Sequence, residues 1–420
     1  MVYSFNKKEG ILIYWNPLKI LGAIKKMKES LFNYRFEYEN QKYIFNTNNN
    51  GLIQINNDIF TEEEREYLRV NRFWVDDNED EIALLEREIN HNIQKRQKEL
   101  ELTIALTNYC NFSCVYCYQN KNEKLMTTEV ANMIIEKIDR ILNDNIFEGI
   151  NIHYFGGEPL LNIPVLIYLD ENIKKITAKI GIVYKAFLTT NGSMLSKELL
   201  QKVKFSSIQL TFDGLEKTHD RLRVSDHFHF KEEIELIENI MNFSQAKVLL
   251  RTNICKENKD EIIALHKYIF EKFGNERIEI NPNRTIKYHQ DDSFEMLSVQ
   301  EYAEVAYQIK LLWSEQKGKF ELPVPRSTPC KFPYGNAYAI SPEGYCTFCS
   351  GSMDQEKKYF FDVDIENKKM FSVRKECKKC NILPLCLGGC IIQYNLRAGA
   401  CTYEKYELKN ILISYIKHIS

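Results

Sequence analysis

The placement of the cysteines constrains this chain more than any other feature. There are twelve, and all except Cys255 lie either in the short loop 110–117 or in the segment 330–401. Disulfide scaffolds are typical of small secreted chains, whereas this chain has 420 residues and begins MVYSFNKKEG, which lacks the pattern of a secretory signal. We therefore expect a cytoplasmic protein whose clustered cysteines are metal ligands or catalytic thiols.

The composition argues against two kinds of partner. The 56 basic and 58 acidic residues nearly balance, so no broad basic surface for nucleic acid is expected. No apolar run approaches the roughly 18 residues that a membrane span needs, so no membrane partner is expected. A composition of 44% hydrophobic and 27% charged residues is ordinary for a globular chain.

Sequence patterns divide the chain into three regions, 1–98, 99–285 and 286–420. The first lacks cysteine and is expected to be a small α+β domain. Its expected elements are strands at 42–47, 52–56 and 73–75, a helix opened by a capping box of Thr61 and Glu64, and a charged helix at about 80–99. The third region begins with a helix at 299–316 and continues as short strands and cysteine-bearing loops.

The middle region alternates strands and helices, which predicts an α/β fold with a parallel sheet, closed partly or fully into a barrel. The six expected strands are 102–106, 150–155, 183–189, 207–212, 247–254 and 277–280. The amphipathic helices expected between them lie near 127–143, 165–179, 196–203, 231–243 and 258–273. The notable motifs follow the ends of these strands, and such barrels place their chemistry at that rim.

The first cysteine group forms a CxxxCxxC loop, Cys110, Cys114 and Cys117, directly after the first strand. Three thiolates on one loop can hold three irons of a 4Fe–4S cluster and leave the fourth iron open to a small chelating molecule. The alternative is a structural zinc loop, which needs a fourth Cys or His, and none follows nearby.

This loop, with the aromatic Tyr116 before its last cysteine, resembles the radical S-adenosylmethionine (radical SAM) superfamily. The resemblance implies a partial (β/α)6 TIM-like barrel in which the amino and carboxylate groups of S-adenosylmethionine chelate the open iron. Electron transfer from the cluster then releases a 5′-deoxyadenosyl radical, which abstracts hydrogen from the substrate. It also implies an external electron donor such as flavodoxin or ferredoxin.

Motifs after the next strands extend the resemblance across residues 100–285. By family pattern Gly156, Gly157 and Glu158 form the amino-group site, and Asn191 belongs to the rim after the third strand. The sequences Thr211-Phe-Asp213-Gly and His219-Asp220-x-x-Arg223 are similar to the family's ribose and carboxylate motifs. The resemblance implies that Thr211 and Asp213 contact the ribose and that Arg223 contacts the methionine carboxylate.

The second cysteine group matches the seven-cysteine SPASM extension of radical SAM enzymes, so three 4Fe–4S clusters are expected in all. By that pattern the second auxiliary cluster has four ligands, Cys377, Cys380, Cys386 and Cys401. The first auxiliary cluster has three, Cys330, Cys349 and Cys390. The alternative for this segment is a pair of zinc knuckles.

The fourth ligand of the first auxiliary cluster is left open by the sequence. Val324 stands where some relatives have an additional cysteine. Either the iron stays open for a substrate thiolate, or Cys346, three residues before Cys349, completes the ligand set. Cys255 is left over and is expected to be a buried, inert thiol.

The resemblance also implies a peptide as the partner. Many maturases of ribosomal peptides carry an N-terminal extension, often winged-helix-like, that recognises a precursor leader by strand addition. Residues 35–56 could supply that strand, and the alternative is a structural cap on the barrel. We expect an enzyme that installs a thioether or carbon–carbon cross-link. The alternatives are formylglycine formation like that of sulfatase maturases, or a non-enzymatic zinc or electron-transfer protein.

Overall fold

The computed structural model describes residues 4–5, 12–13, 26–55, 60–144, 147–274, 277–287, 294–347, 349–352, 358–363, 370–390 and 401–419. The chain forms two compact units, each built from separate segments. One comprises residues 93–312 and 331–369, and contains the parallel sheet. The other comprises residues 1–92, 313–330 and 370–420, so the beginning and the end of the chain share a unit.

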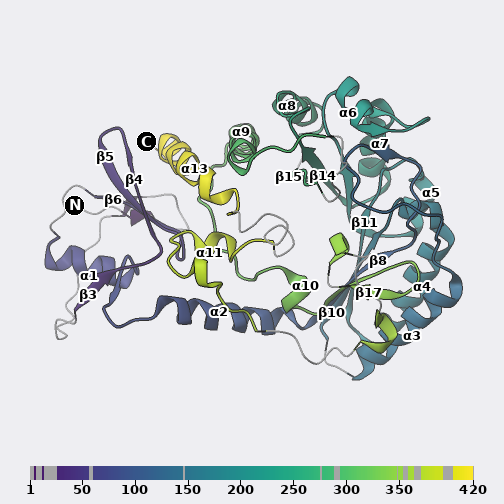
Figure 1. Ribbon diagram of the computed structural model, residues 1–420, viewed down its shortest axis with the longest axis horizontal. Helices are drawn as coiled ribbons and strands as arrows, with labels where there is room; N and C mark the ends of the chain where they lie inside the picture. Colours follow the sequence, from purple (N-terminus) through teal and green to yellow (C-terminus); the bar gives the residue numbers. More distant parts are fainter. Residues whose placement is uncertain are drawn as a thin grey trace. The chain divides into compact units, whose positions relative to one another are not determined.

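The parallel-sheet unit confirms the expected α/β fold (Figure 1). Its six parallel strands follow one another in space in chain order, and the last does not pair with the first, so the barrel is open. The strands are β8 Glu99–Ala105, β10 Gly149–Phe155, β11 Val183–Thr189, β12 Phe205–Thr211, β14 Lys247–Ile254 and β15 Ile278–Arg284.

Helices alternate with these strands and cover the outer face of the sheet. In α3 the buried residues Ala131, Ile134, Ile138 and Ile141 recur at helical spacing and form one apolar stripe. The helices are α3 Thr128–Asp144, α4 Ile163–Ile180, α5 Lys197–Lys202, α6 Glu216–Leu222, α7 Phe230–Phe243, α8 Ile262–Phe273 and α9 Val299–Lys317. All were expected from the sequence except α6, which is short.

Three further strands extend this sheet beyond β8, and the sequence did not predict their place. Strand β16 (Ala337–Ile340) runs parallel to β8, and β17 (Tyr345–Thr347) and β18 (Lys358–Tyr359) follow antiparallel. The short helices α10 Lys331–Tyr334 and η3 Phe360–Asp362 flank them. Part of the cysteine-rich C-terminal region is therefore built onto the barrel sheet.

The other unit has an antiparallel sheet in the order β2-β1-β6-β5-β4. Its strands are β1 Ser4–Phe5, β2 Leu12–Ile13, β4 Asn33–Tyr38, β5 Gln41–Asn46 and β6 Gly51–Ile55, and a separate pair joins β3 Met27–Glu29 to β7 Trp74–Asp76. Helices α1 Glu62–Val70 and α2 Glu81–Arg96 follow, and the capping box of Thr61 and Glu64 is confirmed. Strand β4 was not expected, and Asn56 lies outside the described residues.

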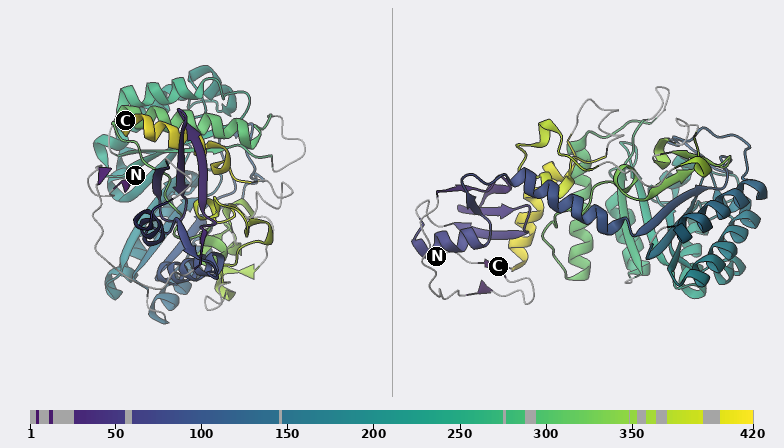
Figure 2. Two further views of the ribbon diagram at one scale, coloured as in Figure 1. Left: turned by 90° about the vertical axis from the view of Figure 1, so that its left-hand side faces the viewer. Right: turned by 90° about the horizontal axis from the view of Figure 1, so that it is seen from below.

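Both faces of this sheet are covered. On one face Ile44 and Ile53 pack with Leu68 of α1 and with Phe73. On the other, Phe45 and Leu52 pack with residues near the chain's end, chiefly on α11 (Leu383–Cys386) and α13 (Glu404–Ile419). Figure 2 shows α13 beside the N-terminal strands. The N-terminal sheet and the C-terminal helix therefore share a core.

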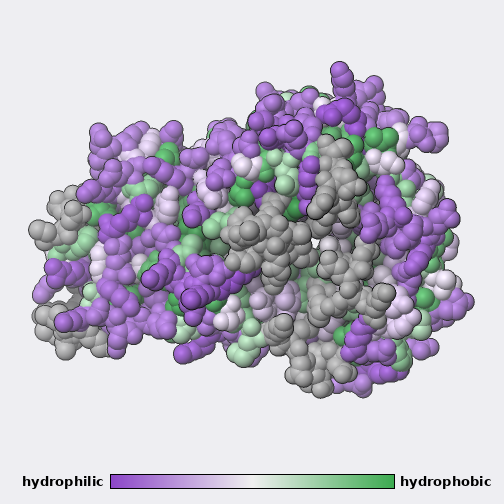
Figure 3. Space-filling model, viewed as in Figure 1, coloured by the Kyte–Doolittle hydropathy of each residue, from purple (hydrophilic) through white to green (hydrophobic). Residues whose placement is uncertain are grey.

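The visible described surface is mostly hydrophilic (Figure 3). Among the described residues no helix is both long enough and apolar enough to cross a membrane.

Candidate active site at the carboxyl end of the barrel

The CxxxCxxC loop leaves the end of β8 and is fixed by backbone hydrogen bonds. Ser113–Cys114 form the short strand β9, which pairs antiparallel with β13 (Arg223–Val224), so that Cys114 lies opposite Arg223. The amide of Val115 donates to the carbonyl of Leu222 at 3.0 Å. The loop is therefore joined to the motif after the fourth strand.

The three thiols of the loop lie together. Burial raises the pKa of Cys114 to about 11 and also raises that of Cys110, and the neighbouring thiolates act in the same direction. Among the described residues no three Cys, His, Asp or Glu side chains are close enough to share a single metal ion. A 4Fe–4S cube binds each thiolate to a different iron, and three thiolates on one loop can hold three of its four irons.

The glycines of the Gly156-Gly157 pair allow close contact with the cysteine loop itself. A Cβ on Gly156 would lie 2.4 Å from the carbonyl oxygen of Thr107, and one on Gly157 would lie 2.1 Å from that of Tyr109. The amides of Gly157 and Glu158 donate to these two carbonyls at 2.8 and 2.9 Å. Side chains at either glycine would displace the loop that carries the thiols.

The carboxylate of Glu158 ties two rim segments together. It is fully buried and accepts hydrogen bonds from Leu160 N (2.9 Å), Thr190 Oγ1 (2.7 Å) and Asn191 N (2.7 Å). Burial raises its pKa to about 7, although these three donors act against that rise. Its position links the end of β10 to the end of β11.

Asn191 connects that rim to the cysteines. Its side-chain amide donates to Asn111 Oδ1 at 2.8 Å and lies 3.8 Å from the sulfur of Cys110. Its side-chain oxygen accepts from the backbone and hydroxyl of Ser193. Amide donors of this kind stabilise negative charge on cluster sulfur and thiolate.

Tyr116, Asp213 and Arg223 form a buried polar group beside the loop. The Tyr116 hydroxyl donates to Asp213, whose other oxygen accepts from the amide of Asn253 at 2.7 Å. Arg223 donates to the Tyr116 oxygen at 3.5 Å, and its guanidinium lies 5.4 Å from the centre of the Phe112 ring. The Arg223 Nε is buried and has no hydrogen-bond partner among the described residues, which fits a site for an anionic ligand group.

The motif His219-Asp220-x-x-Arg223 divides into two roles. His219 is buried against Phe212 and Phe230, and its ring lies 3.1 Å from the Glu233 carboxylate. Asp220 accepts from the amide of Phe230 at the start of α7. These residues hold helices α6 and α7, and only Arg223 reaches the cysteine loop. Thr211, at the end of β12, is buried near the same rim.

Asn258 supports the polar group of Tyr116, Asp213 and Arg223. The sequence gave no reason to single it out. Its side chain donates to the carbonyls of Asp213 (2.7 Å) and Asn253 (2.9 Å) and accepts from the amide of Cys255. Cys255 itself is fully buried, as expected, and its pKa is raised to about 12 by burial and by Glu257. The only signal in the sequence was that Cys255 and Asn258 follow the fifth barrel strand.

Four cysteines of the second group lie near one another in the unit that contains the N-terminal sheet. Burial raises the pKa of Cys377, and the charges of Cys380 and Cys401 add to the rise; burial also raises the pKa of Cys386 to about 11, with a smaller contribution from Cys380. Cys386 ends α11, and Cys380 packs against the core shared with α13. This is the set that the sequence assigned to one cluster.

The remaining cysteines do not all belong to the same unit. Cys330 and Cys390 are exposed residues of the unit with the N-terminal sheet, whereas Cys349 belongs to the barrel unit. Cys346 lies opposite Ile340 in the β16–β17 pair, hence on the face that also carries Tyr338. Cys349 packs instead against Ala337 and Ala339, on the opposite face.

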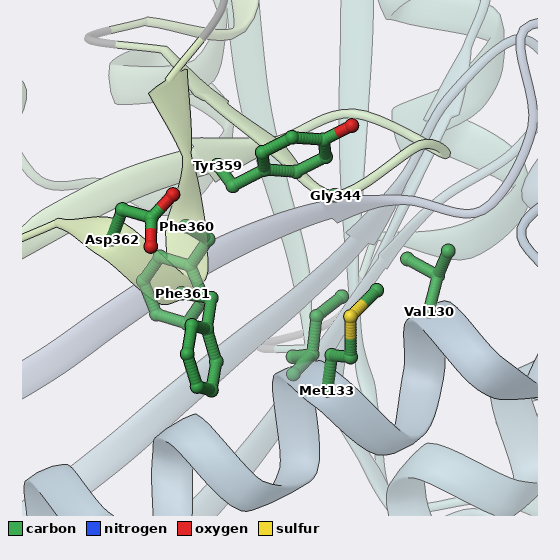
Figure 4. A pocket seen from close by; sticks show the side chains of 8 residues that line it. Val130, Met133, Gly344, Tyr359, Phe360, Phe361 and Asp362 are labelled. Atoms are coloured by element: carbon green, nitrogen blue, oxygen red, sulfur yellow. The ribbon is translucent and has the colours of Figure 1, made fainter.

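A separate apolar pocket of about 280 Å³ lies between α3 and two short stretches, at Gly344 and at 359–362 (Figure 4). Val130 and Met133 face Tyr359 and Phe361 across it. No residue that lines it was predicted for the site.

Comparison with known proteins agrees with this geometry. Residues 104–269 match the family model described as the radical SAM superfamily. The matched segment begins within β8 and contains the cysteine loop and every motif of the rim. This region of the chain is therefore similar to the radical SAM superfamily of enzymes.

Among its relatives is the radical SAM cyclopropyl synthase TigE of Paramaledivibacter caminithermalis, 23% identical over 78% of this chain and 76% of TigE. Two curated relatives reach 34% and 31% identity, but the chain covers only 39% and 53% of their length.

Solved structures share the fold. One is anSMEcpe with bound AdoMet and a peptide, with TM-score 0.62 and 18% identity over 76% of this chain and 98% of that chain. Another is SuiB of Streptococcus suis bound to the precursor peptide SuiA, with TM-score 0.53 and 15% identity over 90% of this chain and 98% of SuiB.

Proposed function

We propose that the protein is a radical SAM peptide maturase with a SPASM-type C-terminal region. The observation that carries this proposal is the joining of the three-thiol loop to four successive rim motifs in one unit. A 4Fe–4S cluster on Cys110, Cys114 and Cys117 would supply the electron that cleaves S-adenosylmethionine to a 5′-deoxyadenosyl radical. An external donor such as flavodoxin or ferredoxin would reduce it, in a reducing compartment such as the cytoplasm.

Some rim residues would contact S-adenosylmethionine directly, and some would hold the rim in position. Arg223 would pair with the methionine carboxylate, since its Nε has no partner in the described part of the chain and Arg223 lies opposite Cys114. Thr211 would contact the ribose. Glu158 would accept the amino group and Asp213 would contact the ribose, as the resemblance implies, and both carboxylates also accept from protein donors. We propose that both carboxylates also position the rim.

The C-terminal cysteines would hold the two auxiliary clusters. The proximity of Cys377, Cys380, Cys386 and Cys401 supports a fully ligated second cluster. For the first, we propose Cys330, Cys349 and Cys390 as the ligands. Cys346 lies on the other sheet face from Cys349, which favours an iron left open for a substrate thiolate. An iron-bound thiolate held near a carbon radical favours a thioether product.

The N-terminal sheet would bind the leader of the precursor peptide. Strand β4 pairs only with β5 among the described strands and so presents a free edge on which a peptide could add a strand. Arg35 and Glu37 are exposed on it. The fold shared with SuiB, solved with its precursor peptide, supports this assignment. The fold shared with anSMEcpe, also solved with a peptide, keeps formylglycine formation as the second candidate.

The test is anaerobic co-expression with the short peptides encoded beside the gene, followed by mass spectrometry. A thioether or carbon–carbon cross-link removes two hydrogens and keeps sulfur, whereas formylglycine formation produces an aldehyde that a hydrazine probe captures. Release of 5′-deoxyadenosine with a cross-linked peptide is the expected result. Stoichiometric zinc without cleavage of S-adenosylmethionine would refute the proposal.

A further inference from the structure

The inner face of the barrel sheet carries an arginine, Arg251, that belongs to none of the motifs described above. On β14 the residues Val248, Leu250 and Thr252 are buried, and the alternation of a strand places Arg251 on the opposite, inner face. In the register of the sheet Arg251 lies between Thr211 of β12 and Asn281 of β15. It is therefore a neighbour of the proposed ribose contact.

Arg251 has few partners within the protein. Its Nε donates to Asn253 Oδ1 at 2.9 Å, and among the described residues no carboxylate lies within ion-pairing distance of the guanidinium. Its two terminal nitrogens have no hydrogen-bond acceptor in the described part of the chain, and neither is sealed from solvent. They are therefore available to a ligand, and a guanidinium pairs most strongly with a carboxylate.

The two arginines of the site differ in their electrostatic surroundings. Burial acts to lower the pKa of both, but Tyr116, Cys114, Glu233 and Asp213 more than offset it at Arg223. At Arg251 burial prevails and the pKa falls, although Tyr118 and Asp213 are near enough to oppose the change. A partly desolvated cation without a counter-ion is costly, and an incoming anion would remove that cost.

We propose that Arg251 binds a carboxylate of the substrate peptide, from an Asp or Glu side chain close to the residue that is modified. This inference rests on the proposed function. The methionine carboxylate would lie at the cysteine loop with Arg223, and Arg251 lies on the next strand, beyond Thr211. Neutral amides on the same inner face, Gln209 and Asn281 among them, suit hydrogen bonding to a peptide backbone.

The experiment measures whether the barrel prefers an acidic peptide. The probes are acetyl-Gly-Glu-Gly-amide and acetyl-Gly-Gln-Gly-amide, titrated into the reconstituted full chain with S-adenosylmethionine and no reductant, with binding followed by saturation-transfer NMR. We expect the parent to bind the Glu peptide about fivefold or more tightly than the Gln peptide. Arg251→Gln should abolish that preference, and Arg251→Lys should retain part of it.

The matched control is Lys247→Gln, an exposed cation at the start of the same strand that pairs with Glu279. This variant should keep the preference of the parent. No preference in the parent, or a preference that persists in Arg251→Gln, overturns the proposal. A loss of S-adenosylmethionine affinity in Arg251→Gln, with no charge preference in the parent, would also overturn it by assigning Arg251 to the cofactor. Iron content and cofactor cleavage by the parent test the proposed function separately.

Discussion

Cysteines gather at two separate sites in the structure, and the two sites are supported in different ways. The loop of Cys110, Cys114 and Cys117 is held by segments of its own unit, through the contacts of Gly157, Glu158 and Arg223. The loop of Cys377, Cys380 and Cys386 depends on residues from the opposite end of the sequence. Its neighbours Ile382 and Leu385 share a core with Phe45 and Leu52 of the N-terminal sheet.

This difference changes what deletion of the N-terminal region would test. Without residues 1–95, the apolar face of α13, including Leu408 and Leu412, would lose the sheet that covers it. The truncated chain would then lose its second auxiliary cluster together with any leader binding, so the two effects could not be separated. Point changes in each unit separate them.

The largest effect is expected from replacing Cys110, Cys114 and Cys117 together with Ala. Cleavage of S-adenosylmethionine should be abolished, because no other described thiols are joined to the rim motifs. Iron bound by the C-terminal cysteines should remain, because none of its proposed ligands lies in the substituted loop. Anaerobic iron analysis and 5′-deoxyadenosine release measure both quantities. If the triple variant still cleaves S-adenosylmethionine, the active cluster is bound elsewhere in the chain.

A smaller but selective loss is expected from Leu412→Ala in α13. Leu412 is fully buried in the shared core, and removing such a side chain costs about 2–5 kcal/mol. The variant should lose auxiliary iron on mild heating while the barrel still binds S-adenosylmethionine. Tyr406→Ala, on the exposed side of the same helix, is the control and should behave like the parent. Equal losses from both units would contradict the division drawn here.

Sequence patterns predicted most of the barrel, because its strands are short apolar segments and the helices between them show a clear helical periodicity. Strands β11 and β14 begin and end where they were expected. The patterns did not reveal β4, although Tyr34, Phe36 and Tyr38 alternate with polar residues along it. Nor did they reveal the pairing of β16 with β8, because it joins segments far apart in the sequence, which local periodicity does not record.

The candidate site shows the same division. The thiols and Arg223 were identified because their spacing carries a chemical meaning. Asn258 and Arg251 were not, because a single Asn or Arg in or after a strand is indistinguishable from a surface residue until its neighbours are known. The supporting contacts of Glu158 and Asp213 also needed the structure, since sequence cannot show which protein donors their oxygens accept from.

Glu158 predicts a pH effect on the stability of the barrel unit. Its pKa rises from an ordinary 4.5 to about 7 on folding, so the folded state binds the proton more tightly. The resulting stabilisation is complete below pH 4.5 and is lost as the pH rises through 7, with a total of about 3 kcal/mol. Glu158→Gln should therefore show a weaker loss of stability between pH 5 and 8, measured by urea unfolding. Identical slopes would show that Glu158 does not titrate in this range.

The smallest effect is expected from Cys346→Ala, which should keep all of its iron. Its thiol faces away from Cys349, so removing it deletes no ligand of the proposed first auxiliary cluster. Cys349→Ala is the matched variant and should lose the iron of that cluster. If Cys346→Ala loses as much iron as Cys349→Ala, the cluster is closed by Cys346 and the thioether assignment is weakened.

The most direct test of the whole account is the anaerobic metal and sulfide content of the full chain, with Mössbauer spectroscopy to identify the iron. Three filled 4Fe–4S clusters predict about twelve irons and about twelve sulfides per chain, with one cluster whose spectrum changes when S-adenosylmethionine is added. Stoichiometric zinc with little iron, or iron whose spectrum is insensitive to S-adenosylmethionine, would contradict the account.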